Sequence, residues 1–215
     1  MVESTKLITQ ELLASGATDF KQWLNSIPAH REEFERHYSE YEPSEEDAVK
    51  LRDVIKDHDG TIRTLIVTDT ESPDAWRGVA VMAKIAEVCN MEISIVPSAG
   101  NEEIVEAFPN MYDETGKPTF VFLDKDGKSL GHLSRRPNQI ELDINRAIEQ
   151  ERGIEFPLEG PEYDVAVAEY LERDGRQHEK AWRHAQLWET INIIDPDILR
   201  LRRGTLGPIG YLTKN

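Results

Sequence analysis

The chain has 215 residues, of which 39% are apolar and 31% charged, a composition typical of a soluble globular protein. No apolar run approaches the ~20 residues of a membrane helix, and the N-terminus lacks the apolar core of a signal peptide, so we expect a cytoplasmic protein. The formal net charge of -16 is spread along the chain, which argues against nucleic acid and membrane surfaces as partners, because phosphate groups bind to concentrated basic faces.

The first part of the chain is predicted to be helical. Residues 5–57 have apolar side chains at helical spacing, with interruptions near Pro28 and Pro43. Ser44, followed by three acids, predicts the start of the last of these helices.

Strands and helices then alternate. The predicted strands are 62–68, 91–96, 118–123 and 129–133, and the predicted helices are 72–89, 102–108 and 138–149. The run at 118–123 is apolar throughout, which predicts a central strand, and Asp124 to Gly127 predict a hairpin turn after it. A further helix is expected over 163–191, followed by a surface tail, LGPIGYLTKN.

This order predicts an α/β fold with a mixed sheet. Over 61–150 it is β-α-β-α-β-β-α, in which the first two strands are parallel and an antiparallel hairpin and a covering helix (138–149) follow. We therefore expect three parts: a helical N-terminal extension (1–60), a central domain (61–150) and a C-terminal helical extension (151–215).

Three segments of the central part carry a family resemblance. The strand TLIVTDT leads directly into the helix start TESPDAWRG, the segment KPTFVFLDKDG joins a proline to a strand and a hairpin, and GHLSRRP precedes a helix. In this order and spacing they resemble the thioredoxin superfamily, and in particular bacterial thioredoxin family proteins of about this length. The resemblance implies a thioredoxin-like fold with additional terminal helices, and a cis proline at Pro118 that faces the helix start.

The resemblance also places Ser72 and Ala75 at the two positions where the family has cysteines, with Pro73 and Asp74 between them. A thiolate at a helix N-terminus attacks a disulfide, and a second cysteine one turn later resolves the mixed disulfide. Serine and alanine provide neither group. The one cysteine, Cys89, lies far along the same helix and is expected to be a buried apolar residue.

The leading hypothesis is therefore a redox-inactive protein that binds a peptide or protein segment around the emptied motif. The candidate binding residues are Ser72, Pro73, Asp74, Ala75, Lys117, Pro118 and Thr119. A second hypothesis is an enzyme that binds a low-molecular-weight thiol of the glutathione type, with Ser72 orienting its sulfur; the simpler interpretation of Ser72 is a helix cap. A third is a homodimeric structural module. Catalysis is the less expected outcome.

Other candidate sites carry less weight. Glu33 and His37 have a spacing that can bind a metal, but no second pair accompanies them, and the aspartates of the 124–127 turn lack a downstream calcium ligand, so we expect no metal and no cofactor. Arg135 and Arg136, near the proposed cis proline, could anchor an anion. The side chains expected at the surface are Asp74 and Arg77, and those expected to pack the last helix onto the domain are Trp182 and Trp188.

Overall fold

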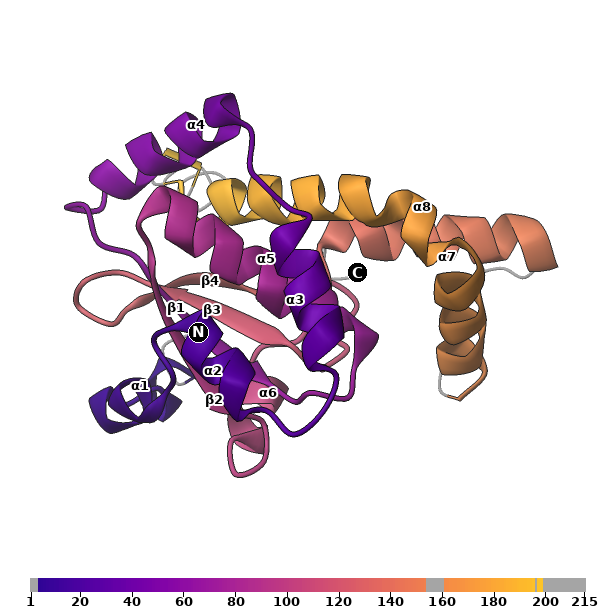
Figure 1. Cartoon of the computed structure of the whole chain (residues 1–215), viewed down its shortest axis with the longest axis horizontal. Coiled ribbons are helices and arrows are strands. Elements are labelled where there is room, and N and C mark those ends of the chain that lie inside the picture. The colour runs from indigo at the N-terminus through magenta and orange to yellow at the C-terminus, as the bar shows by residue number, and fades with distance from the viewer. Residues whose placement is uncertain (1–3, 154–160, 196, 199–215) are drawn as a thin grey trace, which may run out of the picture.

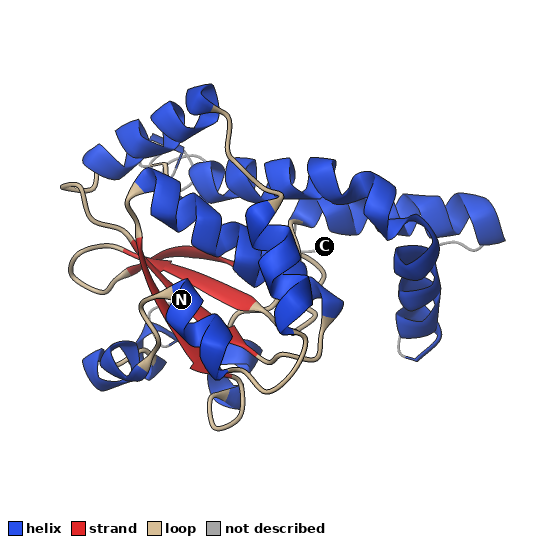
Figure 2. Ribbon diagram, viewed as in Figure 1, coloured by secondary structure: helices blue, strands red, loops and turns tan. Residues whose placement is uncertain are grey.

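The computed structural model describes residues 4–153, 161–195 and 197–198 of the chain. A sheet lies between layers of helices, and a long helix near the C-terminus crosses the helical layer on one face (Figure 1, Figure 2). None of the helices in the described ranges combines the length and apolarity that a membrane crossing requires. The predicted surface tail at 206–215 lies outside the described residues.

Four strands form one mixed sheet in the order β2-β1-β3-β4. Their bounds are β1 (Arg63–Thr68), β2 (Glu92–Pro97), β3 (Thr119–Leu123) and β4 (Ser129–Ser134). β1 and β2 are parallel, while β3 is antiparallel to both β1 and β4. Each strand begins and ends within one residue of its prediction, and the central place of the third strand is confirmed.

Helices precede and follow the strands in the sequence, and they cover both faces of the sheet. They are the 3-10 turn η1 (Ser4–Leu7) and the α-helices α1 (Gln10–Ser15), α2 (Phe20–Ser26), α3 (Arg31–Ser39), α4 (Glu45–Lys56), α5 (Pro73–Cys89), α6 (Glu102–Ala107), α7 (Asn138–Arg152) and α8 (Pro161–Ile194). Pro28 and Pro43 lie between helices, as predicted. Four of the helices begin at a side chain that accepts a backbone N–H of the first turn: Thr9, Asp19, Ser44 and Ser72.

The alternation of side chains along the strands separates two cores. Ile66 and Phe120 face the cluster that contains the buried side of α5, whereas Leu65 and Val121 face a smaller cluster formed with α1 and α6. Because successive residues of a strand point to opposite faces, one apolar strand supplies both layers. This explains why β1 and β3 are apolar nearly throughout.

The position of α7 differs from the prediction that it covers the sheet. Its apolar side, with Ile140 and Ile144, packs against Tyr163 and Val167 of α8 in a separate cluster. The later part of α8 covers the sheet instead, since Leu187 joins the main core there. Figure 1 shows α7 and the first part of α8 extending away from the sheet. The three-part division of the chain stays a prediction, although α8 completes the core of the central part.

Candidate functional site

The start of α5 is built around its helix cap. Ser72 Oγ accepts the backbone N–H of Asp74 at 3.2 Å, and Pro73 occupies the first helical turn, where a missing N–H costs nothing. Asp69 Oδ1 in turn accepts the N–H groups of Glu71 and Ser72 at 3.1 and 3.2 Å. Ser72 therefore has the capping role that its sequence position suggested, while Ala75 is completely buried below it.

The loop before β3 faces this helix start. The Lys117–Pro118 bond is cis, as the resemblance implied. A Cβ on Gly78 of α5 would lie only 3.2 Å from Pro118 Cγ, so the loop and the helix pack closely. Pro118 O accepts the N–H of Arg135 at 2.8 Å, whereas the N–H and C=O of Lys117 have no hydrogen-bond partner among the described residues. Thr119 is fully buried, and its hydroxyl donates to the carbonyl of the loop at residue 116.

An ion pair joins the loop to the end of β1. Lys117 Nζ lies 2.6 Å from Asp69 Oδ2, while the other oxygen of this carboxylate holds the turn into α5. Burial raises the pKa of Asp69, but the hydrogen bond and charge of Lys117 outweigh it, so the pKa lies below its usual value. Asp69 was not among the predicted site residues.

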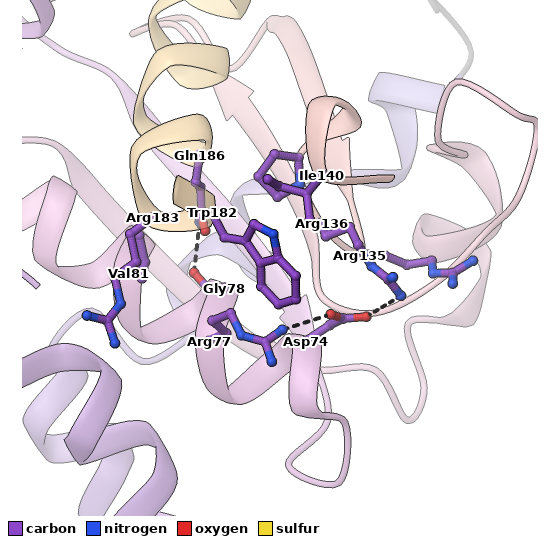
Figure 3. Close-up of a pocket in the computed structure, with 11 residues that line it drawn as sticks. Asp74, Arg77, Gly78, Val81, Arg135, Arg136, Ile140, Trp182, Arg183 and Gln186 are labelled. Carbon is purple, nitrogen blue, oxygen red and sulfur yellow. Dashed lines mark hydrogen bonds and ion pairs between the residues drawn. The ribbon is translucent and has the colours of Figure 1, made fainter. Parts of the chain in front are cut away.

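Asp74 and Arg77 are not surface residues, contrary to the expectation. Asp74 is 8% exposed, and its carboxylate lies 2.8 Å from Arg136 Nη2 and 3.3 Å from Arg77 Nη1. Figure 3 shows Asp74 between these two arginines. The Arg77 guanidinium also lies over the ring of Trp182, 4.4 Å from its centroid. Burial raises the pKa of Asp74, and the surrounding guanidinium groups more than reverse this, so the pKa lies below its ordinary value.

The two consecutive arginines that were considered as an anion anchor are each already paired. Arg136 Nε lies 3.3 Å from the buried carboxylate of Glu141, in addition to its contact with Asp74. Arg135 Nη1 lies 2.9 Å from Glu114, and the Arg135 backbone has a positive φ of 64°. Arg136 is not saturated by these contacts, because its Nη1 atom is buried and has no hydrogen-bond partner among the described residues. The positive φ is unusual for a residue with a side chain, and such conformations concentrate at functional sites.

A groove with a volume of about 570 Å³ lies beside the start of α5. α3 and the first part of α8 form its walls, so the helical extensions narrow the site and do not fill it. Its lining residues, which define "the groove" below, are Glu33, Arg36, His37, Ser72, Pro73, Trp76, Arg77, Arg135, Arg136, Asp164, Val167, Ala168, Leu171, Glu172, Gly175, Arg176 and Glu179.

Only some of the predicted binding residues line the groove. Ser72 and Pro73 line it, whereas Lys117 and Pro118 lie outside its lining and adjoin it through Arg135. Trp76 also lines the groove and was not among the predicted site residues; its indole N–H donates to Thr70 O at 2.7 Å. The position of Trp76 on α5 does not indicate a groove in the sequence, because the facing wall is formed by α8, which lies far along the chain.

The Glu33–His37 pair does not gather further metal ligands, and no cluster of three or more such side chains occurs in the described part of the chain. His37 is 2% exposed and lies 2.9 Å from Arg36 and 3.4 Å from Arg183. Burial and these positive charges lower the pKa of His37 to about 3, so its imidazole is neutral at physiological pH. Glu179 lies between the same two arginines and joins α3 to α8.

The remaining predictions concern side chains away from the groove opening. Cys89 is 1% exposed, as expected of a buried apolar residue, and burial raises the pKa of its thiol to about 11. Trp182 is 5% exposed and packs α8 onto α5 through Arg77. Trp188 is half-buried, with Lys50 of α4 over its ring at 4.8 Å. Both tryptophans thus have the packing role that was expected.

Comparisons with known proteins give the same fold. A family model described as thioredoxin matches residues 17–147, a range that begins within the N-terminal helices. An HIV epitope-scaffold crystal structure aligns with a TM-score of 0.56 at 19% identity, covering 86% of this chain and 96% of the other. A protein of unknown function from Pseudomonas aeruginosa aligns with a TM-score of 0.54 at 18% identity, covering 87% and 96%. No curated protein matches the chain.

Proposed function

We propose that the chain, which belongs to the thioredoxin family whose model matches residues 17–147, is a binding protein for an extended peptide segment and has no thiol–disulfide activity. The observation that carries the proposal is the groove at the start of α5, which lies where the family's cysteine motif would be. Fold alone does not fix function, so the function is inferred from the residues of the site.

The chemistry of the site favours binding over sulfur exchange. Ser72 and Ala75 replace the two cysteines, and the thiol of Cys89 is buried, with a pKa raised to about 11. A thiolate at physiological pH is therefore a minor species, and it has no route to a substrate disulfide. Nothing at the start of α5 can carry out the attack or the resolving step.

The main chain of Lys117 is available to pair with an extended peptide. Its N–H and C=O have no partner among the described residues, and they precede the first residue of β3 by only two positions. An extended peptide that pairs with this residue adds two main-chain hydrogen bonds, each contributing about 0.5–1.5 kcal/mol net. Its side chains then extend past Arg135 into the groove, where Pro73 and Trp76 offer apolar surface.

The test is selection from a random octapeptide library, followed by calorimetric titration of a selected peptide. Ala168 is exposed and lines the groove, so we expect Ala168→Arg to weaken binding about tenfold or more, which is the effect of filling a contact site. Val165 is 54% exposed on the same helix and outside the groove lining, so Val165→Arg is the matched control and should bind as the unchanged chain does.

Two results would contradict the proposal. One is a failure to select any peptide whose binding responds to Ala168→Arg. The other is turnover of insulin disulfides that survives Cys89→Ser, since this would demonstrate sulfur chemistry without any cysteine in the chain.

A thiol cofactor is the second candidate, and one observation favours it. Ser72 lines the groove and accepts the N–H of Asp74, yet its own hydroxyl proton has no acceptor among the described residues. A hydroxyl in this position can donate to the sulfur or carboxylate of a glutathione-type ligand. Retention on immobilised glutathione that is lost in Ser72→Ala would support this candidate, and absence of retention would remove it.

A further inference from the structure

The groove is lined by an apolar strip and by charged side chains, several of them exposed. The strip consists of Pro73 and Trp76 on one wall and Val167 and Leu171 on the other. Four arginines of the lining are held in ion pairs with neighbouring carboxylates: Arg36, Arg77, Arg135 and Arg136. By contrast, three exposed charged residues on the α8 wall have no ion-pair partner among the described residues: the acids Asp164 and Glu172 and the base Arg176.

The C-terminal segment, residues 199–215, is basic and partly apolar. It carries no aspartate or glutamate, although the whole chain has a net charge of -16; Arg200, Arg202 and Arg203 lie in its first part, and Lys214 lies in its last eight residues. Its last eight residues, PIGYLTKN, contain three large apolar side chains and begin with a proline, a composition that favours extended backbone over helix.

The segment is long enough to reach the groove of its own chain. α8 carries the chain from Gly175, in the groove wall, to Ile194, a distance of about 29 Å at the rise of an α-helix. A return over this distance needs about nine extended residues at ~3.3 Å each. A stretch of the length of residues 199–207 suffices for the return, so the groove is within reach of residues 208–215.

We propose that residues 208–215 occupy the groove of their own chain as a tethered ligand. The proposal rests on the proposed function, because the tail uses the same surface as a peptide partner. A tethered ligand acts at an effective concentration in the millimolar range, so it competes with any free peptide of modest affinity. The tail thereby limits binding to partners that outcompete it.

The experiment uses the full-length chain and the synthetic octapeptide PIGYLTKN. Tyr211→Asp places a negative charge in the segment that would lie in the groove, and Thr205→Asp places the same charge in the connecting stretch. We expect Tyr211→Asp to bind the added octapeptide at least ~10-fold more tightly than either the unchanged chain or Thr205→Asp, because only this variant frees the groove. Adding Ala168→Arg to Tyr211→Asp should abolish the binding.

Three outcomes would overturn the inference. If Tyr211→Asp does not bind the octapeptide while library-selected peptides bind it and the unchanged chain equally, the groove is a peptide site without a tethered ligand. If neither kind of peptide binds, the proposed function fails as well. If the unchanged chain associates with rising concentration in sizing experiments and Tyr211→Asp does not, the tail occupies the groove of a second copy.

Discussion

Replacing Arg136 with methionine tests how the start of α5 is held against the rest of the domain. The guanidinium is 6% exposed and lies between two carboxylates, 2.8 Å from Asp74 and 3.3 Å from Glu141. The methionine side chain fills similar space without charge. The change therefore leaves Asp74 with Arg77 alone, at 3.3 Å, and removes the cation between two elements that are far apart in sequence.

The magnitude follows from the burial of the pair. Removing one partner of a buried ion pair costs about 3–5 kcal/mol, because the other charge is left in a poorly solvated place. Arg77 still compensates Asp74, but the buried carboxylate of Glu141 loses its ion-pair partner, so we expect at least about 3 kcal/mol of unfolding free energy to be lost at pH 7. For a chain of this size, that corresponds to a melting temperature lower by about 6–12 °C.

The cost should depend on pH with a definite sign. In the unchanged chain the folded pKa of Asp74 is depressed, so its stabilising contribution is present above the unfolded pKa of ~3.9 and is lost as the pH falls through the folded pKa. In Arg136→Met the pKa of Asp74 rises, because burial then acts against fewer positive charges. The variant's Asp74 takes up its proton first, and the difference in stability between the two chains shrinks as the pH falls from 7 to 4.

The assay is urea unfolding at several pH values, with Arg135→Met as control. Arg135 forms a more exposed ion pair with Glu114, for which a loss of at most about 1 kcal/mol is expected. Equal stability of Arg136→Met and the unchanged chain at pH 7, or a difference that grows as the pH falls, would refute this account of Asp74 and Arg136.

Four further predictions concern single sites. Ser72→Ala should lose about 1 kcal/mol of stability through the helix cap alone, measured by thermal melting, whereas Ser72→Asp should lose little. Gly78→Ala should lower the unfolding free energy by about 1–3 kcal/mol, because its Cβ would lie 3.2 Å from the Pro118 and Phe120 side chains. Gly175→Ala, whose Cβ has its nearest contact at 3.9 Å, should raise the unfolding free energy by up to about 1 kcal/mol, and urea unfolding measures both changes. The Cys89 thiol, with its pKa raised to about 11, should react with a thiol reagent at pH 8 only at the rate of chain opening, so rapid labelling of the folded chain would contradict its burial. The pKa of His37 is lowered to about 3, so below pH ~6.5 the unfolded chain takes up a proton at His37 that the folded chain does not, and the unfolding free energy falls by about 2 kcal/mol by pH 5. His37→Gln should therefore make the unfolding free energy, measured in urea, depend less on pH between 7 and 5. An unchanged pH dependence would contradict this.

Local patterns predicted the elements of the fold well. The start of α5 is visible in the sequence because a serine cap and a proline in the first turn act over a few residues. The strand at 119–123 is visible because it is buried on both faces. The family resemblance, and not the local pattern, supplied the cis bond before Pro118.

Contacts between distant segments could not be predicted in this way. Asp74 resembles a surface residue of a first helical turn, and its burial depends on Arg136, which follows 62 positions later. The apolar stripe of α7 has the same spacing whether it packs on the sheet or on α8, and only the tertiary structure places it against Tyr163. The groove likewise joins α3, α5 and α8, so no single stretch of sequence contains it.

The central claim is that an extended peptide pairs with the main chain beside the emptied cysteine motif. Amide hydrogen exchange at Lys117 tests it most directly, because this N–H has no partner among the described residues. In the presence of a saturating selected peptide, we predict that the Lys117 amide exchanges more slowly in the unchanged chain than in Ala168→Arg. Equal exchange rates at Lys117 in the two chains, with the peptide bound to the unchanged chain, would contradict the claim.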